Sequence, residues 1–501
     1  MTGSLFQLFK NAVGDPARPM IRPPDGKPLC YGDCFATAAR FAHVLVQHGV
    51  RPGDRIAVQV EKSPSAVCLY LACLRAGAVY LPLNTGYTPS ELSYFVGDAE
   101  PSLFVCAAKN LETISGVLPQ IKFLTLDDDG ESGSLVDQAA AQPIDFPDAD
   151  IGMTDLASIL YTSGTTGRSK GAMLTHGNLC SNAESLKDTW HFTAEDVLLH
   201  ALPIFHIHGL FVAINVTLIS GASLILLPKF DLNDIFRALP SATVMMGVPT
   251  FYTRLIGDSR LNPEVTRNIR LFISGSAPLL ADTHREWQAR TGHAILERYG
   301  MTETNMNTSN PYDGPRLPGS VGKPLPGVEL RIASKDGAVL PQGEIGLIEV
   351  RGPNVFKGYW RMPDRTAAEF RADAFFITGD LGRIDENGYV HILGRDKDLI
   401  ITGGFNVYPK EIEILIDELP GVTESAVVGL PHRDFGEGVT ACVVTGNNAH
   451  LTEKEVLDSL IGRLAKFKHP KRVVFLEELP RNTMGKVQKN MIREKFAKLY
   501  D

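Results

Sequence analysis

Short apolar runs alternate with longer segments of helical periodicity over most of this sequence. Residues 36–49 carry apolar side chains at helical spacing, and residues 55–60 then form a strand-like run. Further strand-like runs follow at 222–227, 244–249 and 271–278. Strands and helices in this alternating order predict parallel sheets covered by helices. The sequence therefore predicts an α/β fold whose N-terminal part contains two parallel-rich α/β subdomains.

The pattern changes near residue 320, where short strands are separated by turns containing glycine. Asp-Gly and Asn-Gly pairs are typical of hairpin connections, so residues 320–395 are predicted to form a small barrel-like β subdomain. A mixed α+β pattern follows, and the charged turn at 395–398 is the best candidate for a linker. We therefore predict a large N-terminal domain over residues 1–394 and a small, mobile α+β domain over residues 395–501.

The composition argues against several classes of function. A formal net charge of -8 is unsuited to binding nucleic acid, and no apolar run reaches the length of about 18 residues that a membrane span needs. The seven cysteines are scattered without a CxxC pair, so neither a zinc site nor a disulfide framework is predicted. Residues 1–10 lack the basic segment and apolar core of a targeting peptide. These features predict a cytoplasmic protein without nucleic-acid or membrane partners.

Residues 162–171 form a stretch rich in glycine and hydroxyl side chains. It follows a predicted buried strand at 156–161, and Asn178 is the predicted cap of the next helix, so the loop is expected between a strand and a helix. Glycines let the backbone approach a bulky anion, and Lys170 adds a charge suited to phosphate. No hydroxyl residue follows Lys170, so this is not a Walker A loop; a flexible hinge without ligand is the alternative interpretation. The candidate phosphate ligands are Thr162, Ser163, Gly164, Thr165, Thr166, Gly167 and Lys170.

Two later stretches could supply the rest of a nucleotide site. Tyr299 could stack on a nucleobase, Thr302 could bond a phosphate, and Glu303 could hold Mg²⁺ through oxygen. The alternative is a helix end with solvated charges. Asp380 follows an apolar strand and could accept hydrogen bonds from ribose hydroxyls, although an aspartate at such a position is often only a turn residue.

Several motifs occur together and in one order along the chain. They lie at 162–171, 299–303, 378–380, 394–398 with the pair Gly403 and Gly404, and 480–486. In this combination the chain resembles an acyl-CoA synthetase of the adenylate-forming superfamily, which also contains luciferases and the adenylation domains of peptide synthetases. The resemblance extends over nearly the whole chain and implies an acid–thiol ligase that uses ATP, Mg²⁺ and CoA.

The resemblance also implies roles for residues that match the motifs. The loop at 162–171 would hold the β- and γ-phosphates, Thr302 would meet the α-phosphate and Glu303 the magnesium. The nucleoside would contact Gly275, Ser276, Ala277, Tyr299, Gly300, Asp380 and Arg395, with Tyr299 on the adenine and the last two on the ribose. One departure from the family is Ser169, which stands where proline usually precedes the loop lysine and leaves the loop less constrained.

The C-terminal part carries the remaining implied roles. Lys486 would be the adenylation lysine, Gly403 and Gly404 the loop of the thiol step, and Lys397 the hinge. His206 matches the aromatic position that lines the acyl and pantetheine passage. Two stretches of one small domain thus share one site, which predicts that the domain rotates about Lys397 between two half-reactions. Lys486 is also a candidate for a lysine acetyltransferase, because acetylation would remove its charge.

The acid is predicted to be small and doubly charged. Arg298 precedes Tyr299, and Arg254 follows another pocket-lining segment; with Ser276 and His206 they would form a polar, cationic acyl site. These features resemble the malonyl-CoA synthetases of the superfamily, which implies malonate, with methylmalonate as a further acid.

Three alternatives to this interpretation stay open on the sequence. Arg254 and Arg298 could instead pair with Glu297 or other acids. A second alternative is a ligase for another short or aromatic acid, such as acetate or a coumarate. The third is a nucleotide-binding sensor that has lost catalysis, although Lys486 and Glu303 together argue against it.

Overall fold

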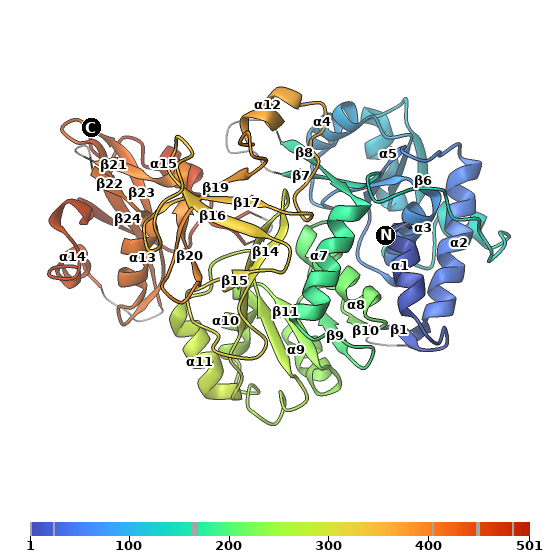
Figure 1. Cartoon of the computed structure of the whole chain (residues 1–501), viewed down its shortest axis with the longest axis horizontal. Helices are drawn as coiled ribbons and strands as arrows, with labels where there is room; N and C mark the ends of the chain where they lie inside the picture. Colours follow the sequence, from blue (N-terminus) through green and yellow to red (C-terminus); the bar gives the residue numbers. More distant parts are fainter. Residues whose placement is uncertain (1–2, 24–25, 163–168, 403–404, 447–450, 483–484) are drawn as a thin grey trace.

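The computed structural model describes residues 3–23, 26–162, 169–402, 405–446, 451–482 and 485–501, which form four sheets. Figure 1 shows three of these sheets in the N-terminal part of the chain and the fourth in the C-terminal part, drawn in orange and red. The α/β class and the division into a large first part and a small second part are confirmed.

The first sheet has seven strands in the order β18-β8-β7-β4-β3-β5-β6. Its strands are β3 (Arg55–Gln59), β4 (Val79–Pro82), β5 (Leu103–Cys106), β6 (Lys122–Thr125), β7 (Leu156–Thr162), β8 (Lys170–Thr175) and β18 (Gly358–Tyr359). The strands from β7 to β6 run parallel, as expected for strands connected through helices. These helices are α2 (Tyr31–Gln47), α3 (Pro64–Ala76), α4 (Pro89–Ala99), α5 (Ala108–Val117) and α6 (Ser134–Ala139). The predicted cap of α3 is confirmed, because the Ser63 side chain accepts from the Ala66 amide.

The second sheet has nine strands in the order β15-β14-β13-β12-β11-β9-β10-β1-β2. Its strands are β1 (Pro19–Arg22), β2 (Leu29–Cys30), β9 (Val197–His200), β10 (Ser223–Leu226), β11 (Val244–Gly247), β12 (Leu271–Ser274), β13 (Leu296–Met301), β14 (Asn305–Ser309) and β15 (Lys323–Pro324). The strands from β1 to β13 are parallel, and the two edges are antiparallel.

The helices that accompany the second sheet include one with π geometry. They are α1 (Leu5–Ala12), α7 (His176–Thr189), the π-helix η1 (His208–Ile214), α8 (Asn215–Ile219), α9 (Leu232–Ala238), the 3₁₀ turn η2 (Leu239–Ser241), α10 (Pro249–Ile256) and α11 (Ala281–Thr291). Buried apolar side chains of α3 and α8 belong to one core cluster, so the two large sheets share a hydrophobic core.

Two local predictions around the phosphate loop are wrong. The loop joins β7 to the antiparallel strand β8, with Thr162 opposite Lys170, so it connects two strands and not a strand to a helix. Helix α7 begins only after β8, and its cap is Thr175. Asn178 is the third helical residue and completes a capping box by accepting from the Thr175 amide. The six-residue strand at Lys170–Thr175 was missed because its small residues carry no alternating pattern.

Residues after 325 build two smaller sheets. The third sheet is antiparallel, in the order β16-β17-β19-β20, from β16 (Glu329–Ala333), β17 (Gly346–Arg351), β19 (Phe376–Ile384) and β20 (Val390–Arg395), with α12 (Pro363–Ala368) between β18 and β19. The 3₁₀ turn η3 (Asp396–Asp398) leads into the fourth sheet, which has the order β22-β21-β24-β23 with β25 beside β24. Its elements are β21 (Ile400–Thr402), β22 (Phe405–Val407), α13 (Pro409–Asp417), β23 (Val422–His432), β24 (Gly436–Thr445), α14 (Glu453–Ser459), η4 (Lys466–Lys468), β25 (Arg472–Leu476) and α15 (Lys489–Lys495).

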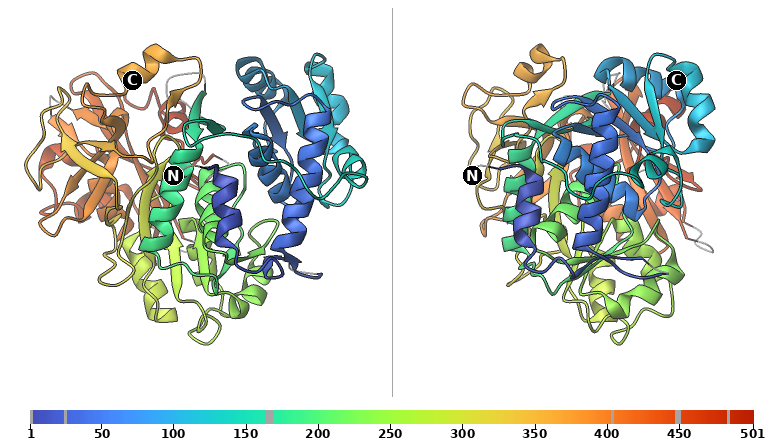
Figure 2. Two further views of the ribbon diagram at one scale, coloured as in Figure 1. Left: turned by 45° about the vertical axis from the view of Figure 1, so that its right-hand side comes forward. Right: turned by 90° about the vertical axis from the view of Figure 1, so that its right-hand side faces the viewer.

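The fourth sheet has its own hydrophobic clusters. The described clusters around Val427 and Val428 contain only residues from Ile400 onwards, so the C-terminal domain has a separate core. Helix α13 lies beside β20, and the left view of Figure 2 shows the red C-terminal elements beside the yellow and orange strands of the four-stranded sheet. The change of sheet falls between Arg395, the last residue of β20, and Ile400, the first of β21.

The cysteines and the lengths of the helices bear on two of the predictions from composition. The seven cysteines are free thiols, and six of them are buried. Among the helices that the structure describes, none has the length and apolarity needed to cross a bilayer.

Candidate functional site

Arg298 is a buried cation with no described acid partner. It lies on β13, its exposed fraction is 4%, and its Nε and Nη2 atoms have no hydrogen-bond partner. Its guanidinium crosses Gly275, where a Cβ atom would lie 2.4 Å from Arg298 Cζ, so a side chain at this position would displace the guanidinium. Burial lowers the pKa of Arg298 to about 9. An arginine kept in this costly state is suited to an anionic ligand that supplies the missing partner.

Glu297 is not that partner. Successive side chains of a strand point to opposite faces, and Glu297 therefore faces away from Arg298. Its carboxyl lies 3.2 Å from His284 Nδ1 and accepts from the Gly319 amide. The alternative in which Arg298 pairs with Glu297 is thus wrong.

Two histidines and a serine lie beside Arg298. His208 Nδ1 lies 3.1 Å from Ser276 Oγ, and the His208 amide donates to His206 Nδ1 at 3.3 Å. The buried Nε2 atom of His208 has no partner among the described residues. Burial, together with the charges of Lys486 and Arg298, lowers the pKa of His206 to about 3, so its imidazole is neutral at physiological pH. Ser276 has a φ of 71°, an unfavourable value for serine that is typical of functional sites.

His208 was missed in the sequence, although the spacing His206-Ile207-His208 places two imidazoles on one short segment. Arg254 lies elsewhere: it is exposed on α10, and its Cζ atom is 5.8 Å from the centre of the Phe230 ring. No described contact joins Arg254 to Arg298. The structure therefore brings together Arg298, Ser276 and His206, adds His208, and leaves Arg254 at the surface.

A second group of side chains lies where β13 approaches the four-stranded sheet. The Tyr299 hydroxyl donates to the Asp380 carboxylate, and Arg395 Nε lies 2.7 Å from Asp380 Oδ1. Asp380 and Arg395 face each other as a directly opposed pair of β19 and β20. The guanidinium of Arg395 also donates to the Thr378 carbonyl at 3.2 Å. Three residues predicted for the nucleoside are thus held in one hydrogen-bonded cluster.

The remaining predicted nucleotide residues border this cluster. A Cβ atom at Gly300 would lie 1.9 Å from the Asn305 carbonyl oxygen, so the turn from β13 to β14 requires glycine. Thr302 is half-buried in that turn, and Ala277 is half-buried beside Ser276. Ser163, Gly164, Thr165, Thr166 and Gly167 lie outside the described residues, as do Gly403 and Gly404.

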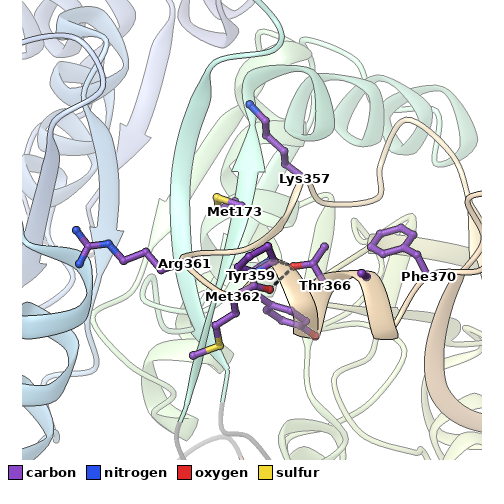
Figure 3. Close-up of a pocket in the computed structure, with 9 residues that line it drawn as sticks. Met173, Lys357, Tyr359, Arg361, Met362, Thr366 and Phe370 are labelled. Atoms are coloured by element: carbon purple, nitrogen blue, oxygen red, sulfur yellow. Dashed lines mark hydrogen bonds between the residues drawn. The ribbon is translucent and has the colours of Figure 1, made fainter.

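Lys170 is held beside the carboxyl predicted to bind magnesium. Its Nζ atom lies 3.0 Å from Glu369 Oε1 and 4.0 Å from the centre of the Tyr359 ring. The Tyr359 hydroxyl lies 3.0 Å from Glu303 Oε1. Glu303 is buried, and burial raises its pKa. Tyr359 also lines a shallow hollow with Met173, Lys357, Arg361, Met362, Pro363, Thr366, Ala367 and Phe370 (Figure 3).

The residues present fit magnesium. The described part of the chain contains no group of three or more His, Cys, Asp or Glu side chains that could enclose a metal. Mg²⁺ is usually held by one or two carboxylates together with phosphates and waters, and it is not usually enclosed by protein alone. The single buried carboxyl of Glu303 suits an ion whose other ligands come from a polyphosphate and water.

Lys486 reaches this site from the C-terminal domain. It stands on a tight turn in which its amide donates to Asn482 Oδ1, and Gly485 before it has a φ of 73°. Lys486 is exposed as a residue, but protein surrounds its ammonium group. Burial and the charge of Arg395 therefore lower its pKa. The charges of Glu303 and Arg298 also act on it. Lys397 is exposed in η3, on the connection between the two domains.

Comparison with known proteins defines the class of this site. The AMP-binding enzyme family matches residues 8–360, and the C-terminal domain of AMP-binding enzymes matches residues 411–486. The chain therefore belongs to the AMP-binding enzyme family and is an AMP-forming acyl-CoA ligase. It is 35% identical to a malonate–CoA ligase of Arabidopsis thaliana over 98% of this chain and 89% of that protein.

Two solved structures of one relative resemble this structure to different degrees. The ATP-bound MatB of Rhodopseudomonas palustris is 60% identical over the whole of both chains and superposes with a TM-score of 0.98. The apo MatB of the same organism has the same identity and coverage but a TM-score of 0.88. The arrangement in which Lys486 reaches the site is therefore more similar to the ATP-bound structure.

Proposed function

We propose that this protein is an ATP- and CoA-dependent ligase that converts malonate to malonyl-CoA through a malonyl-adenylate, with release of AMP and pyrophosphate. The observation that carries the choice of acid is the buried guanidinium of Arg298, for which the described residues supply no acid partner. A monocarboxylate with an apolar chain would leave this charge uncompensated, whereas a dicarboxylate neutralises it. The malonate–CoA ligase of Arabidopsis thaliana is a relative that supports the same acid.

The two carboxylates of malonate would have different roles. Arg298 binds the distal carboxylate through its two unpartnered nitrogens, while His208 and Ser276 complete the wall of the pocket. The short distance between the malonate carboxylates then places the other one near His206 and Lys486. Because His206 is neutral, it can donate a hydrogen bond without adding charge.

The reaction has two half-reactions. A carboxylate oxygen attacks the α-phosphorus of ATP, a P–O bond forms, and the bond to pyrophosphate breaks. The CoA thiolate then attacks the adenylate carbonyl, a C–S bond forms, and AMP leaves with the electron pair of the broken C–O bond. Such transfers depend mainly on positioning and charge neutralisation.

The chain's own residues supply that positioning. Tyr299 stacks on the adenine, Asp380 and Arg395 hold the ribose, and Lys486 places its ammonium at the developing charge. Glu303 would hold Mg²⁺, which would supply charge neutralisation to the polyphosphate. Thr302 and the loop at 162–171 bind the phosphates.

The thiol step would use a second orientation of the C-terminal domain. We infer a boundary at residues 394 and 395, close to the change of sheet, and a hinge at Lys397, which is exposed between the two domains. The separate core of the C-terminal domain supports its movement as a unit. The pair Gly403 and Gly404 would then line the passage for pantetheine.

Two cellular properties extend the proposal. Seven free thiols support a reducing compartment, and we propose the cytoplasm. Lys486 is an exposed residue of the C-terminal domain, which supports modification by an acetyltransferase when its amine is outside the site; acetylation would remove the charge needed for adenylation. A protein acetylated at Lys486 that forms adenylate at the unmodified rate would refute this regulatory role.

An acid screen tests the function directly. Pyrophosphate release is measured with ATP, Mg²⁺ and each of malonate, methylmalonate, acetate, butyrate and coumarate, with and without CoA. We expect malonate to give the highest kcat/KM and to yield a thioester only when CoA is present. A higher kcat/KM for a monocarboxylate would show that Arg298 does not select the acid.

A further inference from the structure

Glu369 and Tyr359 connect the loop lysine to the metal carboxyl. Lys170 is the first residue of β8, Tyr359 is in β18, Glu369 lies one residue past α12, and Glu303 follows β13. The Tyr359 hydroxyl lies 2.7 Å from Glu369 Oε2 and 3.0 Å from Glu303 Oε1, while Glu369 Oε1 lies 3.0 Å from Lys170 Nζ. A continuous chain of contacts therefore runs from Lys170 through Glu369 and Tyr359 to Glu303.

The backbone holds this chain of contacts in place. Tyr359 is paired with Ala172 across β18 and β8, and the Trp360 amide donates to the Gly171 carbonyl at 2.7 Å. The Tyr359 amide donates to Thr366 Oγ1 at 2.9 Å, as Figure 3 shows, which ties β18 to the helix before Glu369. The tyrosine is thus fixed relative to the strand that carries Lys170.

The side chains of Glu369 and Lys170 are each only 16% exposed, so the pair is largely withdrawn from water. A buried ion pair contributes little net stability, because the desolvation of both charges offsets their attraction. Stability alone therefore does not account for a carboxylate at this position. Arg365 also contacts Glu369 Oε1, at 2.6 Å, but its own side chain is 51% exposed and no described contact joins it to Lys170 or Glu303.

We propose that Glu369 and Tyr359 are positioning residues for magnesium and pyrophosphate. Glu369 holds the Lys170 ammonium directly and orients the Glu303 carboxyl through the Tyr359 hydroxyl, so that both groups face the polyphosphate together. The inference rests on the proposed function, in which Glu303 holds the metal and Lys170 meets the phosphates.

The size of the change in Mg²⁺ requirement can be estimated from other metal sites. Groups that orient a metal ligand by hydrogen bonding typically contribute about 10- to 100-fold to metal affinity or activity. Tyr359→Phe removes only the hydroxyl, and Glu369→Gln removes the charge that anchors Lys170. In each variant the Mg²⁺ concentration that gives half-maximal stabilisation by ATP and half-maximal pyrophosphate release should therefore rise about 10- to 100-fold. The KM for malonate should stay unchanged.

The experiment measures binding as well as turnover. The thermal stabilisation by ATP is titrated with Mg²⁺ in the full-length wild type, Tyr359→Phe, Glu369→Gln and the control Arg365→Ala. Pyrophosphate release with malonate is measured over the same Mg²⁺ range. We expect a raised half-maximal Mg²⁺ concentration in the first two variants, recovery of turnover at high Mg²⁺, and wild-type behaviour of Arg365→Ala.

Several outcomes would overturn the inference. An unchanged Mg²⁺ requirement in Tyr359→Phe excludes a positioning role, and so does an equal loss of turnover at every Mg²⁺ concentration with a raised malonate KM. If Glu369→Gln does not fold, the isosteric Tyr359→Phe decides alone. A wild type that ATP and Mg²⁺ do not stabilise, and that releases no pyrophosphate with malonate, would refute the proposed function itself.

Discussion

Replacing Arg298 with methionine tests two effects of its buried charge: its effect on the stability of the fold and its effect on malonate binding. The guanidinium is 4% exposed and has two unpartnered nitrogens. Burial lowers its pKa to about 9, which at about 1.4 kcal/mol per pKa unit corresponds to a penalty on the order of 5 kcal/mol for the charged form. Methionine has similar length without the charge, so the variant keeps most of the packing.

Two opposite changes are expected from this substitution. Loss of a charge-assisted contact to the distal carboxylate costs about 2–5 kcal/mol, so kcat/KM for malonate should fall roughly 30- to several-thousand-fold. Replacing a buried charge with an apolar side chain is often stabilising by about 1–4 kcal/mol, so the ligand-free variant should have a higher Tm than the wild type.

The assay compares malonate with butyrate in pyrophosphate release and records Tm without ligands. Arg254→Met is the matched control, because this arginine is exposed and shares no described contact with Arg298. Its kcat/KM for malonate should change little. Equal losses of kcat/KM for malonate and butyrate in Arg298→Met, or a lowered Tm, would refute the assignment of Arg298 to the distal carboxylate.

Three further perturbations test other parts of the argument. Lys486→Ala should abolish adenylate formation and leave thioester formation from supplied malonyl-adenylate intact; equal loss of both half-reactions would contradict the assignment. Lys397→Pro should impair one half-reaction strongly and the other little, because proline fixes φ at the hinge, whereas wild-type thioester synthesis would place the hinge elsewhere. Burial lowers the pKa of His176 to about 4 and of His200 to about 3. The unfolded chain therefore takes up protons first as the pH falls below about 6.5, and each histidine should cost about 2 kcal/mol of stability at pH 5. Tm should decline from pH 8 to pH 5, less steeply in His176→Gln, and a flat profile would exclude this origin.

Local features of the fold were predictable because they depend on neighbouring residues. The Ser63 cap of α3 and the parallel strands that follow need only short-range periodicity and capping chemistry. The strand Lys170–Thr175 was not predicted, because its residues carry no alternating pattern and its antiparallel pairing with β7 is evident only in the folded chain. The cap of α7 was predicted at Asn178 and lies at Thr175, because α7 begins directly after the strand that was not predicted.

The sequence by itself identified several of the charged and aromatic groups of the site. Tyr299, Glu303, Asp380, Arg395 and Lys486 were singled out by motif, and the folded chain brings them to one region. The resemblance suffices for this, because the chain carries these motifs in the same order as the family to which it belongs.

Only the tertiary structure decided which charged groups meet. Arg254 and Arg298 look alike in the sequence, yet Arg254 is exposed beside Phe230, whereas Arg298 is buried with no acid partner among the residues that the structure describes. His208 and Glu369 stood in no recognised motif and joined the site through contacts with Ser276 and Lys170. Such contacts join residues far apart in the sequence and depend on the path of the whole chain, whereas periodicity records only whether a side chain faces the core.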